Sequence, residues 1–178
     1  MSFNTFGIDE LKIQLRRLEN VPLIASETMK ASAEELRQKA RDMAPEDFGD
    51  LKRAIQTRAT AAQGAGGRLV GLRNYEVFVN NNTSVRDPKK IRGAGKGAVK
   101  VGDYAWLVHE YMGYGSVPGY LPNGRSFNPS AESIAAGEKA GVEAGGKFLE
   151  RATISLEGKI QADMMRAIRK YVEALDFG

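Results

Sequence analysis

The sequence predicts an α+β fold in which N-terminal helices and a long C-terminal helix pack on a small antiparallel β-sheet, with two long loop excursions. Two observations support this class. Apolar residues recur at steps of three and four near both ends of the chain and alternate with polar residues in its middle. With 178 residues and a 42% hydrophobic composition, the chain can bury one ordinary core, so we expect a single domain over 1–178.

Two helices are expected over 7–43. The first covers 7–20, and Pro22, which suits a first helical turn, opens the second. The apolar faces of these helices consist of Ile8, Leu11, Leu15, Leu18, Met29, Ala33, Leu36, Ala40 and Met43. Pro45 ends the second helix because its ring clashes with the preceding turn, and Gly49 allows a tight turn into a strand.

The region 50–113 is predicted to form the sheet. From Leu51 the pattern is strand-like, and residues 54–60 lead into a glycine-rich turn at 64–67. In the run 69–79, Tyr75, Val77 and Val79 alternate with Asn74, Glu76 and Phe78, as in the second strand of a hairpin. We therefore expect a β-hairpin with one buried face.

A third strand is expected over 101–108, after the first loop excursion. Tyr104 and Trp106 are two residues apart, so in a strand they would share one face of the sheet. We interpret both as core aromatics rather than as a platform for a ligand.

The second excursion, 114–146, holds many glycines and three of the six prolines, with a loose short helix expected near 130–136. The C-terminal helix is predicted over 147–175. Its apolar residues are spaced by four throughout: Phe148, Ala152, Leu156, Ile160, Met164, Ile168 and Val172. Such a stripe winds slowly around a straight helix, so it would serve two surfaces.

Positive charge is concentrated in the first excursion, 81–100. Between Ser84 and Lys100, one acid, Asp87, stands against the basic residues Arg86, Lys89, Lys90, Arg92, Lys96 and Lys100. This basic segment carries a net +5 and the whole chain +4, which leaves −1 for the rest. A basic loop on a near-neutral body contacts an acidic partner or is simply solvated. Between acidic partners we favour protein over DNA, because the segment has no aromatic residue to stack on bases.

The sequence gives little support to catalysis or metal binding. The absence of cysteine excludes disulfides and thiolate ligands. The single histidine, His109, stands beside Glu110, and the two supply too few ligands for a zinc site. Residues 93–97 are only loosely like a phosphate loop, because Gly97 rather than Ser or Thr follows Lys96. No apolar run reaches the ~20 residues of a membrane helix. We expect no enzyme activity, small-molecule substrate, cofactor, metal or membrane contact.

Three short stretches occur in a characteristic order: APEDFGDLKRAI over 44–55, YAWLVHEYMG over 104–113 and GKFLERA over 146–152. This order, within a frame of helix, strands and helix, resembles the tail-component family of tailed bacteriophages typified by the tenth gene product of phage HK97, also called tail-completion or head-tail joining proteins. The matching positions are Pro45, Gly49, Leu51, Ile55, Tyr104, Ala105, Glu110, Gly113, Phe148, Leu149 and Ala152. Phe48 stands where the family has threonine, and Lys147 where it has proline.

The resemblance implies a structural virion protein. Such proteins form rings, typically hexameric, at the head-proximal end of the tail, where they neighbour the tail terminator and tube and join the head connector. The protein would be assembled in the host cytoplasm and reside in the neck of the virion. Six basic segments would place about +30 on one ring, facing an acidic connector or the DNA in the channel. The alternatives are a tail terminator or another connector ring of the same neck, and a small nucleic-acid-binding protein without sequence specificity.

Overall fold

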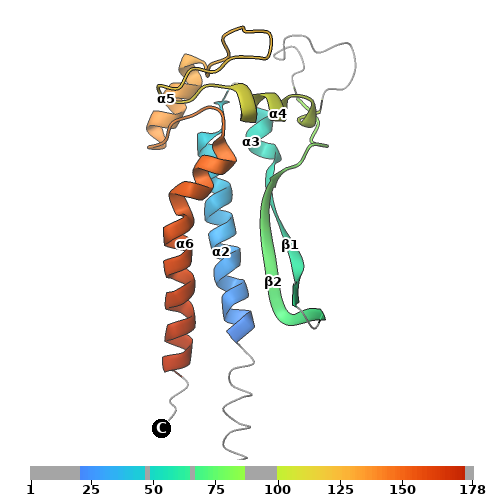
Figure 1. The fold of residues 1–178 in the computed structure, drawn as a ribbon, viewed down its shortest axis with the longest axis vertical. Coiled ribbons are helices and arrows are strands. Elements are labelled where there is room, and N and C mark those ends of the chain that lie inside the picture. The colour runs from blue at the N-terminus through green and yellow to red at the C-terminus, as the bar shows by residue number, and fades with distance from the viewer. Residues whose placement is uncertain (1–20, 47–48, 65–66, 87–99, 175–178) are drawn as a thin grey trace, which may run out of the picture. The chain divides into compact units, whose positions relative to one another are not determined.

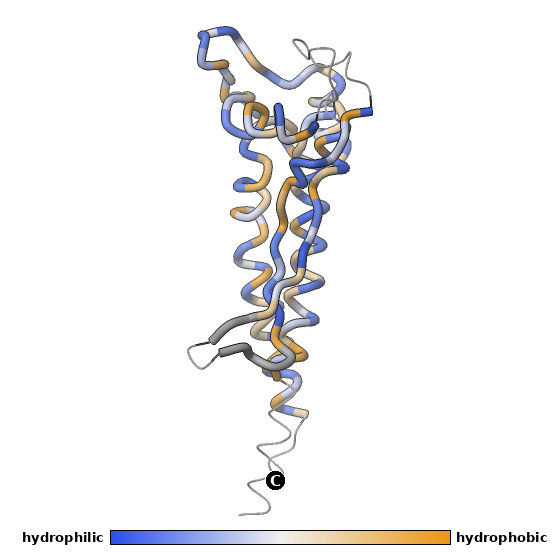
Figure 2. The backbone as a smooth tube through the Cα atoms, turned by 90° about the vertical axis from the view of Figure 1, so that its right-hand side faces the viewer, coloured by the Kyte–Doolittle hydropathy of each residue, from blue (hydrophilic) through white to orange (hydrophobic). Residues whose placement is uncertain are grey.

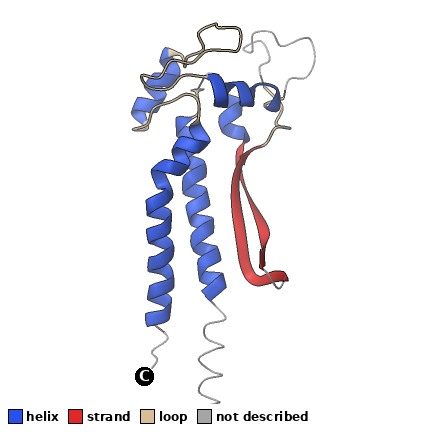
Figure 3. Ribbon diagram, viewed as in Figure 1, coloured by secondary structure: helices blue, strands red, loops and turns tan. Residues whose placement is uncertain are grey.

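A computed structural model describes residues 21–46, 49–64, 67–86 and 100–174 (Figure 1). The elements in chain order are α2 (Val21–Met43), α3 (Gly49–Ala54), β1 (Ile55–Gly64), β2 (Gly67–Val79), α4 (Gly102–Tyr111), α5 (Ala131–Lys139) and α6 (Phe148–Glu173). Figure 3 shows that helices dominate and that the two strands form a single antiparallel hairpin. The predicted α+β class, with a small sheet and a long C-terminal helix, is confirmed.

The chain divides into two compact units. Among the described residues, the smaller unit takes 21–32, 59–76 and 157–174, and the larger takes 33–58 and 77–156. The single-domain organisation expected from chain length stays a prediction. The site described below lies entirely within the larger unit.

The hydrophobic core of the larger unit is built by four helices and the first residue of the hairpin. Its buried members are Ala40, Met43, Ala44, Leu51, Ala54, Ile55, Val101, Tyr104, Ala105, Val108, Met112, Phe148 and Ala152. Within this unit the end of α2 and the start of α6 lie side by side, and α4 and α5 gather at the start of α6 (Figure 1).

The second predicted helix is confirmed as α2, which has Pro22 in its first turn and ends at Met43. The helix expected over 7–20 lies outside the described residues. Pro45 is fully buried just beyond the end of α2. The Arg41 guanidinium donates two hydrogen bonds, of 3.2 and 2.9 Å, to the carbonyl oxygen of Ile55. This contact fixes the end of α2 to the first residue of β1.

The predicted turn from Gly49 into a strand at Leu51 is wrong. Gly49 begins the short helix α3, and Leu51 is a fully buried residue of that helix. The strand begins only at Ile55. The spacing explains the correction, because Leu51, Ala54 and Ile55 lie at helical steps of three and four and all face the core.

The hairpin of β1 and β2 is confirmed, and it is the whole sheet among the described residues. In β2, Tyr75 and Val77 are partly buried and Asn74 and Glu76 exposed, whereas Phe78, expected on the opposite face, is partly buried like Val77 and Val79. The Arg58 guanidinium of β1 lies 5.1 Å from the centre of the Phe78 ring on β2, so a cation–π contact joins the strands.

The predicted third strand over 101–108 is wrong, because residues 102–111 form the helix α4. Residues two apart on a helix differ by about 200° in direction, so they cannot share a face. Tyr104 is accordingly buried, whereas Trp106 is 59% exposed and does not belong to the core. The Trp106 ring instead packs edge-to-face on Tyr111, with 5.1 Å between ring centres.

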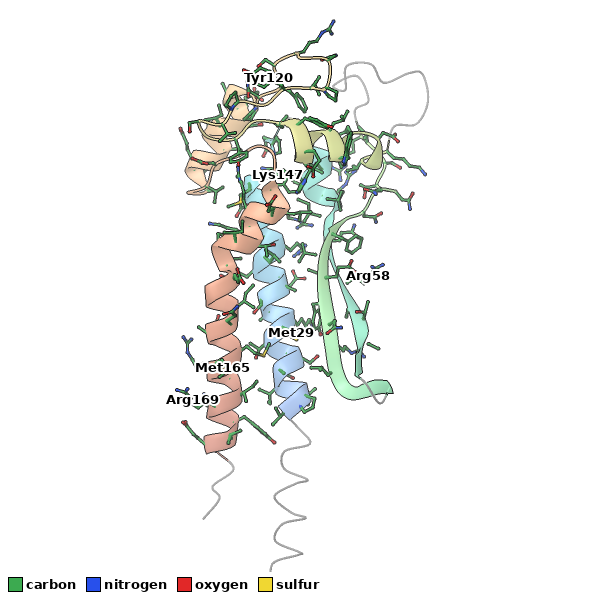
Figure 4. All side chains as sticks on the ribbon, in the orientation of Figure 1. Met29, Arg58, Tyr120, Lys147, Met165 and Arg169 are labelled. Atoms are coloured by element: carbon green, nitrogen blue, oxygen red, sulfur yellow. The ribbon has the colours of Figure 1, made fainter. Side chains whose placement is uncertain are left out.

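The second excursion folds back on itself. Tyr114 forms antiparallel bridges with both Val117 and Gly145, so the start and end of the excursion are paired. The short helix expected near 130–136 is present as α5, and Ser130 caps it by accepting a hydrogen bond from the backbone N–H of Ser133. Figure 4 shows Tyr120, which is 55% exposed, on the loop before α5.

The predicted C-terminal helix is confirmed as α6. Phe148, Ala152 and Leu156 of the predicted stripe are buried in the larger unit. The stripe continues in the smaller unit with Ile160, Met164, Ile168 and Val172, which are partly buried. Met165, labelled in Figure 4, is 60% exposed beside this stripe. Figure 2 shows that apolar and polar residues alternate along the long helices. Among the described residues, no helix has the length and apolar character needed to span a membrane.

Candidate functional site

The three stretches singled out in the sequence meet in one place. Leu51 from the first, Tyr104 from the second and Phe148 from the third belong to a single buried cluster, against which Leu149 packs partly buried. Pro45 is also fully buried. Residues far apart in the chain therefore build one site at the junction of α3, α4 and α6.

An ion pair joins the second and third stretches on the outside of this junction. The Glu110 carboxylate accepts a hydrogen bond of 2.7 Å from Lys147 Nζ and lies 2.8 Å from His109 Nδ1. The hydrogen bond from Lys147 lowers the pKa of Glu110, and the same bond raises the pKa of Lys147. Both side chains are 36% exposed, so we assign the pair to orientation more than to stability.

Lys147 is also special in its backbone. It is the one non-glycine residue with positive φ in the described part of the chain, at 53°, and it immediately precedes α6 (Figure 4). Its N–H donates a hydrogen bond of 2.8 Å to the carbonyl oxygen of His109. Proline has neither the N–H nor access to this φ. The start of α6 therefore differs from the proline-led start that the resemblance describes. The positive φ and the backbone hydrogen bond at position 147 explain why lysine and not proline stands there.

Four glycines allow the backbone to cross itself beside this ion pair. We call Gly113, Gly119, Gly145 and Gly146 the glycine crossing. The Gly113 N–H donates a hydrogen bond of 2.9 Å to the Phe127 carbonyl oxygen, and the Gly146 N–H donates one of 3.2 Å to the Gly113 carbonyl oxygen. A Cβ added at Gly113 would lie 2.6 Å from the Gly119 nitrogen, a distance no side chain tolerates. Gly113 is a predicted site residue and Gly146 begins the third stretch, whereas the one sequence signal for Gly119 and Gly145 is the abundance of glycine in the second excursion.

An open groove of about 470 Å³ lies beside the glycine crossing. The turn 114–118, the helix α5 and the segment 142–144 form its walls, and we call it the Tyr114 groove. Val117 and Ile134 line it and are 48% and 47% exposed. The groove was not predicted, because it forms only where the second excursion closes on itself.

Two acids give the Tyr114 groove its charge. Glu138 and Glu143 both line it. Among the described residues, neither carboxylate has an ion-pair or hydrogen-bond partner, although Glu143 acts electrostatically on the nearby Arg151. Gly115, with φ of 50°, leaves room for Glu143, because an added Cβ there would lie 2.6 Å from its carboxylate. The groove is therefore an apolar surface with two acids, of which Glu143 already interacts with Arg151.

Hydrogen bonds fix the two ends of the basic segment to α3 and α4. Ser84 and Lys100 form an antiparallel bridge. The Lys100 N–H donates a hydrogen bond of 2.8 Å to Asp103 Oδ2 in the first turn of α4. Arg86 N donates 2.8 Å to Asp50 Oδ2 of α3. The remaining predicted contact residues, Lys89, Lys90, Arg92 and Lys96, lie outside the described residues.

The described residues contain no group of three or more His, Cys, Asp or Glu side chains placed to hold a metal ion. His109 instead contacts the edge of the buried Phe148 ring, with 5.1 Å between ring centres. The described part of the site combines a closely packed glycine crossing with an acidic groove and the two ends of a basic segment. Comparison with models of known protein families, with curated proteins and with solved structures found no match.

Tyr104 provides a test of the buried junction through pH. Burial raises the pKa of Tyr104 to about 12, Asp50 adds to the rise and Arg53 opposes it. Because the fold favours the neutral phenol, its stabilisation is complete below pH 10 and is lost as pH rises from about 10 to about 12. We expect Tyr104→Phe to remove roughly 2 kcal/mol of this alkaline destabilisation. Urea unfolding of the wild type and of Tyr104→Phe at pH 8 and pH 11.5 measures how much unfolding free energy each protein loses between the two pH values. Equal losses in the two proteins would contradict the raised pKa of Tyr104.

Proposed function

We propose that this chain is a structural protein of a tailed bacteriophage that forms a ring at the head-proximal end of the tail and joins it to the head connector. The observation that carries the proposal is the convergence of the three sequence stretches on one core. One large residue from each stretch, Leu51, Tyr104 and Phe148, lies in the same buried cluster, which supports treating the three stretches as one structural unit. The α+β frame with a long C-terminal helix also agrees with this class.

Exposed apolar side chains favour an assembly role for the larger unit. Trp106 is 59% exposed, and it is the only tryptophan in the chain. Tryptophan is enriched among the residues that dominate protein interfaces, because burying its large ring excludes much water. A pair such as Trp106 and Tyr111 on the outer side of α4 is suited to cover by another chain.

The charge distribution supports a head-to-tail arrangement of copies. A closed ring needs two different surfaces on each subunit, one that meets the next copy and one that meets the previous copy. The larger unit offers an acidic groove and the two ends of a basic segment at separate places. The second candidate, a nucleic-acid-binding protein, is favoured only by the +5 charge of that segment.

The solution mass of the purified protein tests the proposal. We expect a discrete oligomer, with rings visible by negative-stain electron microscopy, whose mass is unchanged by short duplex DNA across a salt series. A chain that stays monomeric at all concentrations would contradict the ring. A DNA complex that weakens steeply with salt would favour the nucleic-acid candidate instead.

Ring position within the neck needs a second measurement. Purified rings mixed with tails that lack this protein should bind only at the head-proximal end, and the completed tails should then join DNA-filled heads. Rings that instead stop tail-tube growth without enabling head joining would favour the tail terminator.

A further inference from the structure

We propose that the Tyr114 groove is the docking site for the basic segment of a second copy of this chain. This inference rests on the proposed ring, and it names the contact that would link one subunit to the next. The occupant is the stretch around Lys90, Ile91 and Arg92, in which cations flank an aliphatic residue.

The chemistry of the groove fits this occupant. Val117 and Ile134 present half-exposed aliphatic surface, and the carboxylates of Glu138 and Glu143 lie along the same walls. An isoleucine flanked by cations places its apolar side chain on such a surface and its charges beside the two acids. Charge complementarity of this kind orients and speeds the encounter more than it adds affinity.

The chain is near neutral apart from this segment, which makes the pairing selective. With +5 in the segment and −1 in everything else, no other part of the sequence gathers comparable positive charge. Burying one acid of the groove without a counter-charge would be costly, so a neutral or acidic partner is a poor occupant.

The positions of the two surfaces favour contact between copies. The basic segment leaves and re-enters the fold at Ser84 and Lys100, by the first turn of α4. The groove begins at Tyr114, beyond the other end of that helix. A helix of this length spans about 15 Å, so the basic segment and the Tyr114 groove lie at opposite ends of α4. A contact from one end of α4 to the far end of a neighbour's α4 joins two different surfaces, which is what the heterologous interface of a closed ring uses.

The basic segment is long enough to reach the Tyr114 groove of a neighbouring copy. A chain of the length between Ser84 and Lys100 that leaves the fold and returns to it can reach at most about 25 Å from its base. This length also permits the segment to meet the groove of its own chain, so the experiment must separate the two arrangements.

Because the chain has no cysteine, cross-linking of single-cysteine variants decides the question. One protein carries Val117→Cys in the groove and another carries Ala94→Cys in the basic segment. We expect oxidation of the mixture to give a disulfide-linked heterodimer. The matched control replaces Val117→Cys by Ile154→Cys, which is 67% exposed on α6 and does not line the groove, and should give little heterodimer.

Charge reversal provides an independent readout. Glu138→Lys with Glu143→Lys should weaken self-association about tenfold in sedimentation velocity. Lys89→Glu with Lys90→Glu in the same chain should restore most of it. The control Glu132→Lys with Glu157→Lys makes the same change in net charge at exposed positions outside the groove, and should leave association unchanged. Circular dichroism checks the fold of each variant, and if the reversed groove does not fold, cross-linking alone decides.

The outcomes separate this contact from the proposed function. Rings that form normally, with no more cross-linking at Val117 than at Ile154, would overturn the groove contact and leave the ring intact. A chain carrying both Ala94→Cys and Val117→Cys that links only within itself would also overturn it. Chains that neither associate nor cross-link would overturn the contact and the ring together.

Discussion

Gly119→Ala is expected to destabilise the protein by at least about 3 kcal/mol. An added Cβ would overlap three backbone atoms, the Gly113 nitrogen and the carbonyl oxygens of Tyr111 and Phe127. Backbone atoms cannot rotate away as the end of a side chain can. The Gly113 N–H that bonds to Phe127 would be displaced as well, so the second excursion would lose its support.

Urea unfolding followed by Trp106 fluorescence measures this effect in the larger unit, because the chain has no other tryptophan. Gly124→Ala is the matched control. Gly124 lies in the same excursion with φ of 78°, and nothing lies within 4 Å of its added Cβ. In that variant the free energy of unfolding should fall by only about 1 kcal/mol, because the left-handed backbone alone disfavours alanine. Similar losses in the two variants would show that the glycine crossing is not tightly packed.

Phe148→Ala is the second large prediction, with an expected loss of about 3 to 5 kcal/mol. Among the residues that the structure describes, Phe148 is the largest fully buried side chain, and it lies where the three sequence stretches meet. Its removal leaves a cavity among helices that also contact one another through Ala152 and Met43, so the walls cannot close without moving the backbone.

Ile154→Ala is the control, since Ile154 is on the same helix but 67% exposed. It should change the free energy of unfolding by less than about 0.5 kcal/mol. Phe148→Leu should recover more than half of the loss, because it refills most of the volume. A loss below about 1 kcal/mol for Phe148→Ala would mean that this residue does not support the junction.

The long helices and the hairpin could be predicted because their signals are local and repeat many times. α6 carries an apolar residue at every fourth position over seven repeats, and the glycine-rich turn at 64–67 marks the hairpin. Such patterns specify secondary structure without knowledge of what the elements contact.

α4 was mistaken for a strand, although its helical signal was present. Its buried residues and their neighbours, Val101, Tyr104, Ala105, Val108 and Met112, are spaced by three and four. Valine and the aromatic residues in the same stretch favour strands, and this preference competes with the helical spacing of the buried residues. Trp106 was placed in the core as a direct result of this error.

The glycine crossing and the Tyr114 groove could not be predicted from local pattern. Both depend on residues 113 and 145 coming together at the ends of a long excursion, as the Tyr114 bridge to Gly145 shows. A glycine is required there by the approach of another backbone segment, and the sequence around it contains no trace of that neighbour. For the basic segment, the sequence supplied the charge and the structure supplied the positions of its ends.

The bridge between Ser84 and Lys100 has an evolutionary consequence. Because the backbone is paired at this point, the sequence between Arg86 and Lys100 can be exchanged while both ends stay fixed to the fold; Val85, which packs against the core, is not part of this exchangeable stretch. Doubling the length of such a loop costs only about 0.6 kcal/mol. Mutation can therefore change what this part of the chain binds while the residues that specify the fold stay the same. Adaptation to a new neighbour then needs few coordinated substitutions.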